Sequence, residues 1–181
     1  MSGAIGTMPR VVDHVLIRRL EHLAASPGGP LIGFGVETRE RPGPLHKHGA
    51  FPDEAVWIQL HGGLIVAKAV VSLCWVGEYS QVADVRARTR GSPLFDLEDF
   101  WKGRPRYGYA GVAGLHRERW LDEPFWAGPR TYGYEWVRLE DEKKRRSWLD
   151  PKEPPRGGSD LLERFRRWLG GPRGRASSAP C

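Results

Sequence analysis

Short apolar runs rich in β-branched and aromatic residues recur along this chain, and turn-forming glycines and prolines separate them. Runs of this length and composition predict β-strands rather than helices. The predicted strands are residues 31–39, 56–60, 64–76, 107–115 and 132–139. The second and third of these strands flank the turn His61-Gly62-Gly63, so we expect them to pair as a hairpin.

Apolar residues at helical spacing predict a smaller number of helices. The first covers residues 11–25, where valines and leucines fall near one face and charged residues lie away from it. Residues 80–88 and 96–101 are expected to form a short helix and a helical turn, and residues 117–124 a connection between strands. Residues 159–169 predict an amphipathic helix. Its apolar stripe would dock on the folded domain, or its arginines would contact nucleic acid or an anionic surface.

These elements indicate one folded domain over residues 11–150. A disordered start, residues 1–10, precedes it, and residues 151–181 are expected to hold a Pro/Gly-rich linker, the amphipathic helix and a disordered basic tail. Many short strands joined by Gly/Pro turns favour a mainly-β (α+β) fold over a layered α/β sheet. We therefore expect a small pseudobarrel of five or six short strands with two or three flanking helices.

The chain has 181 residues, a formal net charge of +6 and a pI of about 9.6, which on their own indicate a polyanionic partner. The charge is uneven, because residues 1–50 carry +2, residues 51–140 carry −1 and residues 141–181 carry +5. Six of the eight tryptophans lie in residues 51–140. We expect specific recognition from this nearly neutral, aromatic middle, and salt-dependent affinity from the basic flanks.

Several classes of protein are excluded by what the sequence lacks. No run approaches the roughly 18 apolar residues of a membrane-spanning helix, and residues 1–10 do not resemble a secretory signal. The two cysteines, Cys74 and Cys181, do not predict a disulfide, so we expect a cytoplasmic protein. Neither a metal-ligand spacing nor a phosphate-binding or dinucleotide glycine motif occurs. No membrane association, metal or cofactor is expected, and the oligomeric state stays open.

The order of the predicted elements and one short motif carry a resemblance to a known family. After the first predicted helix, the stretch Gly35-Val36-Glu37-Thr38-Arg39-Glu40-Arg41-Pro42 aligns with the motif G-x-K-x-x-E-x-R. The first glycine and the second glutamate match, whereas a glutamate replaces the lysine and a proline the final arginine. Over residues 11–140 the chain resembles the PUA-like superfamily of pseudobarrels, and within it the ASCH and EVE-type domains. The resemblance implies a binder of RNA or modified bases, or a small hydrolase or nuclease.

Charged residues on two predicted strands are the first candidates for contact with a ligand. Arg39 and Glu40 stand at a strand end, where a guanidinium can grip phosphate bidentately and a carboxylate can read a base edge or act as a general base. A solvated charged turn is the alternative interpretation. Lys68 interrupts a strongly apolar strand, so it points either into a cleft or outward from the sheet.

Aromatic residues beside turns are the second group of candidates. Trp75, Glu78 and Tyr79 stand where the long predicted strand gives way to a helix, and Arg130 and Tyr132 follow a Gly-Pro turn. The aromatic rings can stack a base, Glu78 can read its edge and Arg130 can bind phosphate. The alternative is that these aromatic side chains pack in the core.

Together these features predict a PUA-like domain that binds RNA, or a modified nucleotide or base, in an aromatic-lined cleft. An enzymatic alternative is a small hydrolase (an amidohydrolase or a nuclease) that acts on a modified nucleoside or RNA, with Lys68 and Glu40 as the catalytic pair. A third interpretation is a protein-interaction module. Whether the protein is an enzyme, and whether it prefers RNA, DNA or a free nucleoside, stays open.

Overall fold

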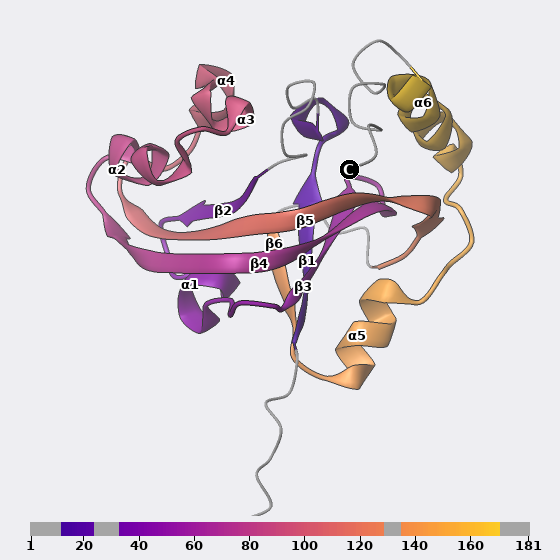
Figure 1. Cartoon of the computed structure of the whole chain (residues 1–181), viewed down its shortest axis with the longest axis horizontal. Coiled ribbons are helices and arrows are strands. Elements are labelled where there is room, and N and C mark those ends of the chain that lie inside the picture. Colours follow the sequence, from indigo (N-terminus) through magenta and orange to yellow (C-terminus); the bar gives the residue numbers. More distant parts are fainter. Residues whose placement is uncertain (1–11, 24–32, 129–134, 171–181) are drawn as a thin grey trace, which may run out of the picture.

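A computed structural model describes residues 12–23, 33–128 and 135–170 of the chain. The six strands in this part form one sheet (Figure 1). They are β1 (Asp13–Arg18), β2 (Phe34–Arg39), β3 (Ala55–Leu60), β4 (Leu64–Tyr79), β5 (Gly108–Trp126) and β6 (Trp136–Leu139). Their order across the sheet is β2-β5-β4-β3-β1-β6, and every neighbouring pair is antiparallel except β1 with β3. The predicted hairpin is confirmed as β3 and β4.

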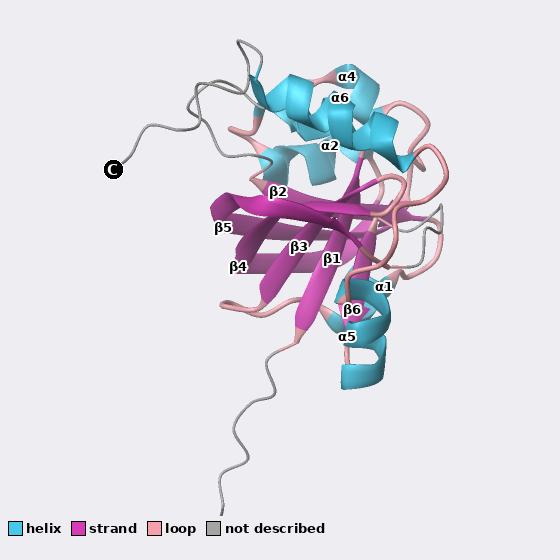
Figure 2. Ribbon diagram, turned by 90° about the vertical axis from the view of Figure 1, so that its right-hand side faces the viewer, coloured by secondary structure: helices cyan, strands magenta, loops and turns pink. Residues whose placement is uncertain are grey.

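Short helices lie on both sides of the sheet. The described residues form the 3₁₀ helices η1 (Leu20–Leu23) and η2 (Ala87–Thr89) and the α-helices α1 (Pro44–His48), α2 (Val82–Arg86), α3 (Pro93–Asp96), α4 (Glu98–Trp101), α5 (Glu142–Leu149) and α6 (Gly158–Gly170). Figure 2 shows α2, α4 and α6 on one side and α1 and α5 on the other. This mainly-β (α+β) architecture confirms the predicted fold class. Its helices are more numerous than predicted, and β4 and β5, with 16 and 19 residues, are not short.

The prediction of a helix over residues 11–25 is wrong. Asp13–Arg18 form β1, which pairs in parallel with β3 on one side and antiparallel with β6 on the other. From His14 onward every side chain of this strand is buried. A strand buried on both faces carries a nearly continuous apolar run, whose spacing does not distinguish strand from helix. The β-branched Val15 and Ile17 favour the strand.

The prediction that residues 117–124 connect two strands is also wrong, since they continue β5. This strand pairs with β4 along its length, with interruptions in the register. One interruption falls between the pairs Val70–His116 and Lys68–Arg119, and Arg117 inside it has a φ of 49°. The extra residues of such a bulge interrupt the alternation of apolar and polar positions, and the exposed polar side chains beside them are typical of a turn. This pattern therefore predicts a connection rather than a strand.

The sheet curls until its edge strands, β2 and β6, meet along a line that we call the seam. Trp136 of β6 is fully buried there, and a Cβ atom added at Gly35 of β2 would lie 2.3 Å from its ring. Arg18 of β1 donates from Nη2 to the carbonyl oxygen of Val36 in β2 at 3.3 Å. Because β2 and β6 are not neighbours in the sheet, side chains hold the curled sheet closed at the seam.

The C-terminal helix α6 docks on the sheet through its apolar stripe, which confirms one of its two predicted roles. Phe165 is buried, and its ring centroid lies 5.5 Å from that of Trp120 on β5. The ring of Trp168 lies 5.3 Å from the same tryptophan. The arginines of α6 remain exposed. None of the described helices is long and apolar enough to span a membrane.

Candidate functional site

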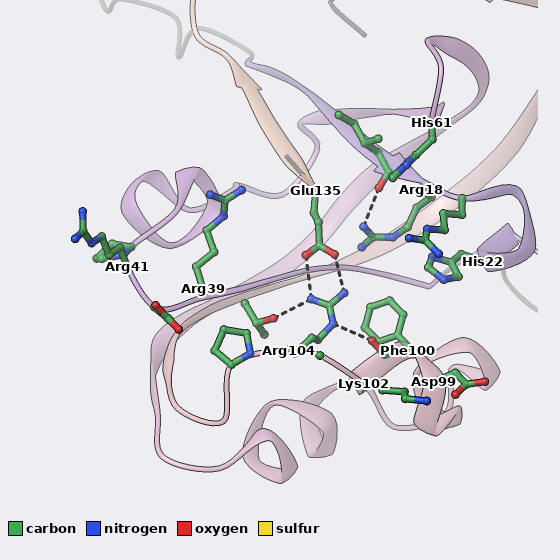
Figure 3. Close-up of a pocket in the computed structure, with 17 residues that line it drawn as sticks. Arg18, His22, Arg39, Arg41, His61, Asp99, Phe100, Lys102, Arg104 and Glu135 are labelled. Atoms are coloured by element: carbon green, nitrogen blue, oxygen red, sulfur yellow. Dashed lines mark hydrogen bonds and ion pairs between the residues drawn. The ribbon is translucent and has the colours of Figure 1, made fainter. Parts of the chain in front are cut away.

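A pocket of about 730 Å³ opens at one end of the seam (Figure 3). Its walls come from the ends of β1 and β2, from the segment between α4 and β5, and from Glu135 just before β6. Three of its lining residues are carboxylates and six are lysine or arginine, and we call it the arginine pocket. The six cations are Arg18, Arg19, Arg39, Arg41, Lys102 and Arg104. The excess of positive charge suits an anionic ligand.

Arg104 holds Glu135 in a fixed position on the pocket wall. Its Nη1 and Nη2 donate to the two carboxylate oxygens at 3.0 and 2.7 Å, and Nη1 also donates to Thr38 Oγ1 at 2.8 Å. The guanidinium lies over the ring of Phe100, 4.1 Å from its centroid. Burial alone would raise the pKa of Glu135, but the positive charges of Arg104 and Arg18 outweigh burial and hold this pKa below its ordinary value. Glu135 is therefore ionised at neutral pH.

Arg18 is a buried cation that forms no close ion pair with any described carboxylate, although the charge of Glu135 acts on it from a longer distance. It is 2% exposed, and its Nη1 donates to the carbonyl oxygen of its neighbour Ile17 at 2.9 Å. Its buried Nε has no hydrogen-bond partner, and none of the described carboxylates forms an ion pair with it. Burial lowers its pKa to about 10, so the side chain still carries its charge at neutral pH. An anion in the pocket would supply the close ion-pair partner that none of the described carboxylates provides.

Arg39 is positioned by Glu37, the residue that replaces the lysine of the family motif. The Arg39 Nε lies 3.3 Å from Glu37 Oε1, and Glu37 Oε2 accepts a hydrogen bond from the backbone N–H of Leu45 at 2.9 Å. Burial raises the pKa of Glu37, against the lowering effect of that hydrogen bond and of Arg39. A Cβ atom at Gly43 would lie 2.4 Å from this carboxyl group, so the glycine makes room for it. Glu37 thus links the arginine pocket to α1.

The two histidines of the pocket, His22 and His61, have lowered pKa values, in part because the pocket is positively charged. Burial, and then the charges of nearby arginines, lower the pKa of both His22 and His61. Both side chains are therefore neutral at neutral pH, where they can donate one hydrogen bond and accept another. A bound anion would raise these pKa values again.

The structure brings only part of the predicted site together. Arg39 and Glu40 both line the arginine pocket. Lys68 does not, because its Nζ lies 4.5 Å from the ring centroid of Trp57 on the neighbouring strand, and none of the described carboxylates pairs with it. The pair Lys68–Glu40 that the enzymatic alternative requires is therefore not assembled in one pocket.

None of the described residues of the predicted aromatic group lines this pocket, although Tyr79 contacts its wall from behind. Trp75 packs against the core, with the guanidinium of Arg88 lying 3.8 Å from its ring centroid. Glu78 is exposed on β4, and Tyr79 is buried and donates its hydroxyl to the carbonyl oxygen of Pro105 at 2.8 Å. The remaining predicted residues, Arg130 and Tyr132, lie outside the residues that the structure describes.

Three residues that the sequence did not suggest are central to the pocket, namely Arg18, Arg104 and Glu135. An arginine that ends an apolar run, as Arg18 does, signals a buried cation only when the run is recognised as a strand. Arg104 stands in a Gly/Pro-rich connection, where no hydrophobic periodicity or motif predicts a role for it. In the described part of the chain, no cluster of three histidine, cysteine or acidic side chains is arranged to hold a metal.

A buried histidine supports the seam beside the pocket. His14 is fully buried, its Nδ1 accepts a hydrogen bond from Trp136 Nε1 at 3.1 Å, and its Nε2 lies 2.8 Å from Glu54 Oε2. Because Nδ1 accepts, the single ring proton lies on Nε2 and is donated to Glu54. Burial lowers the pKa of His14, despite the opposing effect of Glu54. The neutral imidazole is the form that the fold requires.

This network predicts that the protein loses stability in mild acid. The folded pKa of His14 lies below the unfolded value of 6.5, so its contribution is complete above that pH and is lost as the pH falls toward the folded pKa. Urea unfolding between about pH 7.5 and 5.5 should show a falling free energy of unfolding. His14→Gln should flatten the slope by up to about 1.4 kcal/mol per pH unit, whereas the exposed control His48→Gln should leave it unchanged. An unchanged slope in His14→Gln would contradict this.

Comparisons with known proteins add one similar structure. No protein-family model matches the chain, and no curated protein matches it. Among solved structures, the N-terminal domain of Staphylothermus marinus McrB is similar at 14% sequence identity and a TM-score of 0.40. The match covers 61% of this chain and 74% of the McrB chain.

Proposed function

We propose that this protein binds nucleic acid in the arginine pocket, as a PUA-like domain of the ASCH or EVE type, with RNA or a modified nucleotide as the ligand. The observation that carries the proposal is Arg18, a buried cation that lines the pocket and has no described carboxylate partner. Glu135 is a counter-charge on the same pocket wall but forms no ion pair with Arg18, so burying this cation costs stability that a phosphate group would offset.

The pocket offers separate groups for the phosphate and for the base. Arg18 and Arg39 line one cavity, and guanidinium groups bind phosphate oxygens through charge-assisted hydrogen bonds, while Arg104 is engaged with Glu135. Glu135 is ionised and fixed by Arg104, so it can only accept hydrogen bonds, such as those from amino or imino groups on a base edge. The ring of Phe100 lines the pocket, but it is buried under the Arg104 guanidinium and is not free to stack a base.

The residues predicted from the sequence take unequal parts in this proposal. Arg39 belongs to the phosphate site, and Glu40 stands exposed on the pocket lining, where it would repel misplaced phosphates. Arg130 and Tyr132 remain candidates for phosphate binding and base stacking. Lys68, Trp75, Glu78 and Tyr79 have no part in it, since none of them lines the pocket.

A salt titration of RNA binding tests the proposal. The full chain should bind a labelled single-stranded RNA in fluorescence anisotropy at about 50 mM salt, and more weakly as salt rises. Arg39→Gln should weaken binding about tenfold and reduce the salt slope by about 0.7–0.9 for one lost phosphate contact. The matched control is Arg166→Gln, which removes the same charge from the exposed face of α6 and should change the affinity less than about twofold. Absence of binding at low salt, or equal losses in both variants, would overturn the proposal.

A further inference from the structure

A second pocket of about 610 Å³ continues the arginine pocket along the seam. It lies between α1 on one wall and β6 and α5 on the other, and we call it the β6 pocket. Arg39 and Pro42 line both pockets, so the two cavities adjoin at the end of β2. A ligand long enough to pass Arg39 could therefore reach both pockets.

The β6 pocket has the same excess of positive charge. Four cations line it against one carboxylate, Glu140, and they are Arg39, Lys47, Arg138 and Lys144. Lys144 is already paired with Glu140 at 3.0 Å. Arg138 donates from Nη1 to the carbonyl oxygen of His48 at 3.4 Å, which holds its guanidinium between β6 and α1. Arg138 and Lys47 are thus the cations best placed to meet a second phosphate.

The floor of this pocket indicates what it recognises. Trp136 and Trp148 line it, but both are buried, so their faces are not free to stack a base. Most of the charged groups around them are cations, and Glu140, the one carboxylate among them, is paired with Lys144. Such a surface binds backbone phosphate regardless of base.

We propose that the two pockets together bind a single-stranded nucleic acid of at least two consecutive nucleotides, one held in the arginine pocket and the next phosphate in the β6 pocket. The inference rests on the proposed function and adds the class of ligand, a strand rather than a free nucleotide. A single strand fits because its nucleotides are unstacked and can enter concave sites, whereas a duplex keeps its bases inside. Arg39, at the junction, contacts the phosphate between the two nucleotides.

A length series with matched variants tests this inference. The probes are a nucleoside monophosphate, a single-stranded RNA of about eight nucleotides and the same RNA as a duplex. The natural chain should bind the single strand at least about tenfold more tightly than either other probe. Arg138→Gln/Lys47→Gln should weaken binding of the single strand about tenfold and change binding of the monophosphate less than about twofold.

The control removes two charges from outside both pockets. Lys143→Gln/Arg166→Gln should change binding of the single strand less than about twofold, since both side chains are exposed on α5 and α6. Equal affinity for the monophosphate or the duplex, or an unchanged affinity of Arg138→Gln/Lys47→Gln, would overturn the inference while the arginine pocket kept its proposed role. Failure of every probe to bind the natural chain would instead overturn the proposed function.

Discussion

Arg104→Met is expected to lower the free energy of unfolding by about 3 kcal/mol, the low end of what breaking a buried ion pair costs. The variant loses two hydrogen bonds to Glu135, one to Thr38 and one to the carbonyl oxygen of Phe100, and it leaves the Glu135 carboxylate unpaired. The side chain of Glu135 is 34% exposed, so water offsets part of the loss. Urea or thermal unfolding of the full chain measures the change.

Two further variants distinguish the loss of the Arg104–Glu135 ion pair from the loss of any positive charge. Arg146 forms an exposed ion pair with Glu142 on α5, and Arg146→Met should cost less than about 0.5 kcal/mol. Arg104→Met/Glu135→Gln should lose less stability than Arg104→Met alone, because the uncompensated carboxylate is gone. If Arg104→Met lowered the free energy of unfolding by less than about 1 kcal/mol, the Arg104–Glu135 pair would not stabilise the contact between β2 and β6.

Arg18→Met is expected to have the opposite effect on stability and a large effect on binding. Methionine fills much of the same space without the cost of burying a cation, and Arg104 still pairs with Glu135, so the variant should be as stable as the natural chain or more stable by about 1–3 kcal/mol. Its affinity for single-stranded RNA should fall at least about tenfold, because the deepest cation of the pocket is lost. Unfolding and anisotropy measurements on the same preparations show both effects.

The control for Arg18 is its neighbour Arg19, which lines the same pocket but is 63% exposed. Arg19→Met should change the free energy of unfolding by less than about 0.5 kcal/mol and the affinity by only a fewfold. A clear loss of stability in Arg18→Met together with unchanged RNA affinity would mean that Arg18 serves the fold through its bonds to Ile17 and Val36.

Much of the fold could be predicted because local patterns specify it. The β3–β4 hairpin follows from apolar runs around His61-Gly62-Gly63, and α6 from an apolar stripe at helical spacing. β1 could not be predicted in this way, because side chains on both of its faces are buried, which leaves no alternation of apolar and polar residues. The second half of β5 was missed because the bulge at Arg117 interrupts its pattern.

The candidate site was predicted only in part, for a different reason. The motif stretch after β1 identified Arg39 and Glu40, since they are neighbours in sequence. Arg18, Arg104 and Glu135 come from three distant segments and meet only because the sheet curls. The local sequence around each of these three residues does not indicate that they meet, whereas aromatic residues that the sequence suggests for binding, such as Tyr79, pack in the fold.

The seam also has a consequence for the order of folding. β3 and β4 pair as a hairpin around His61-Gly62-Gly63, whereas Trp136 of β6 meets Gly35 of β2 from a distant part of the chain. Contacts between such distant residues cost more loop entropy and form later than contacts within a hairpin. The arginine pocket takes its walls from β1, β2 and Glu135, so it exists only after this last closure. A folding intermediate that already contains most of the sheet would still have no pocket to bind with.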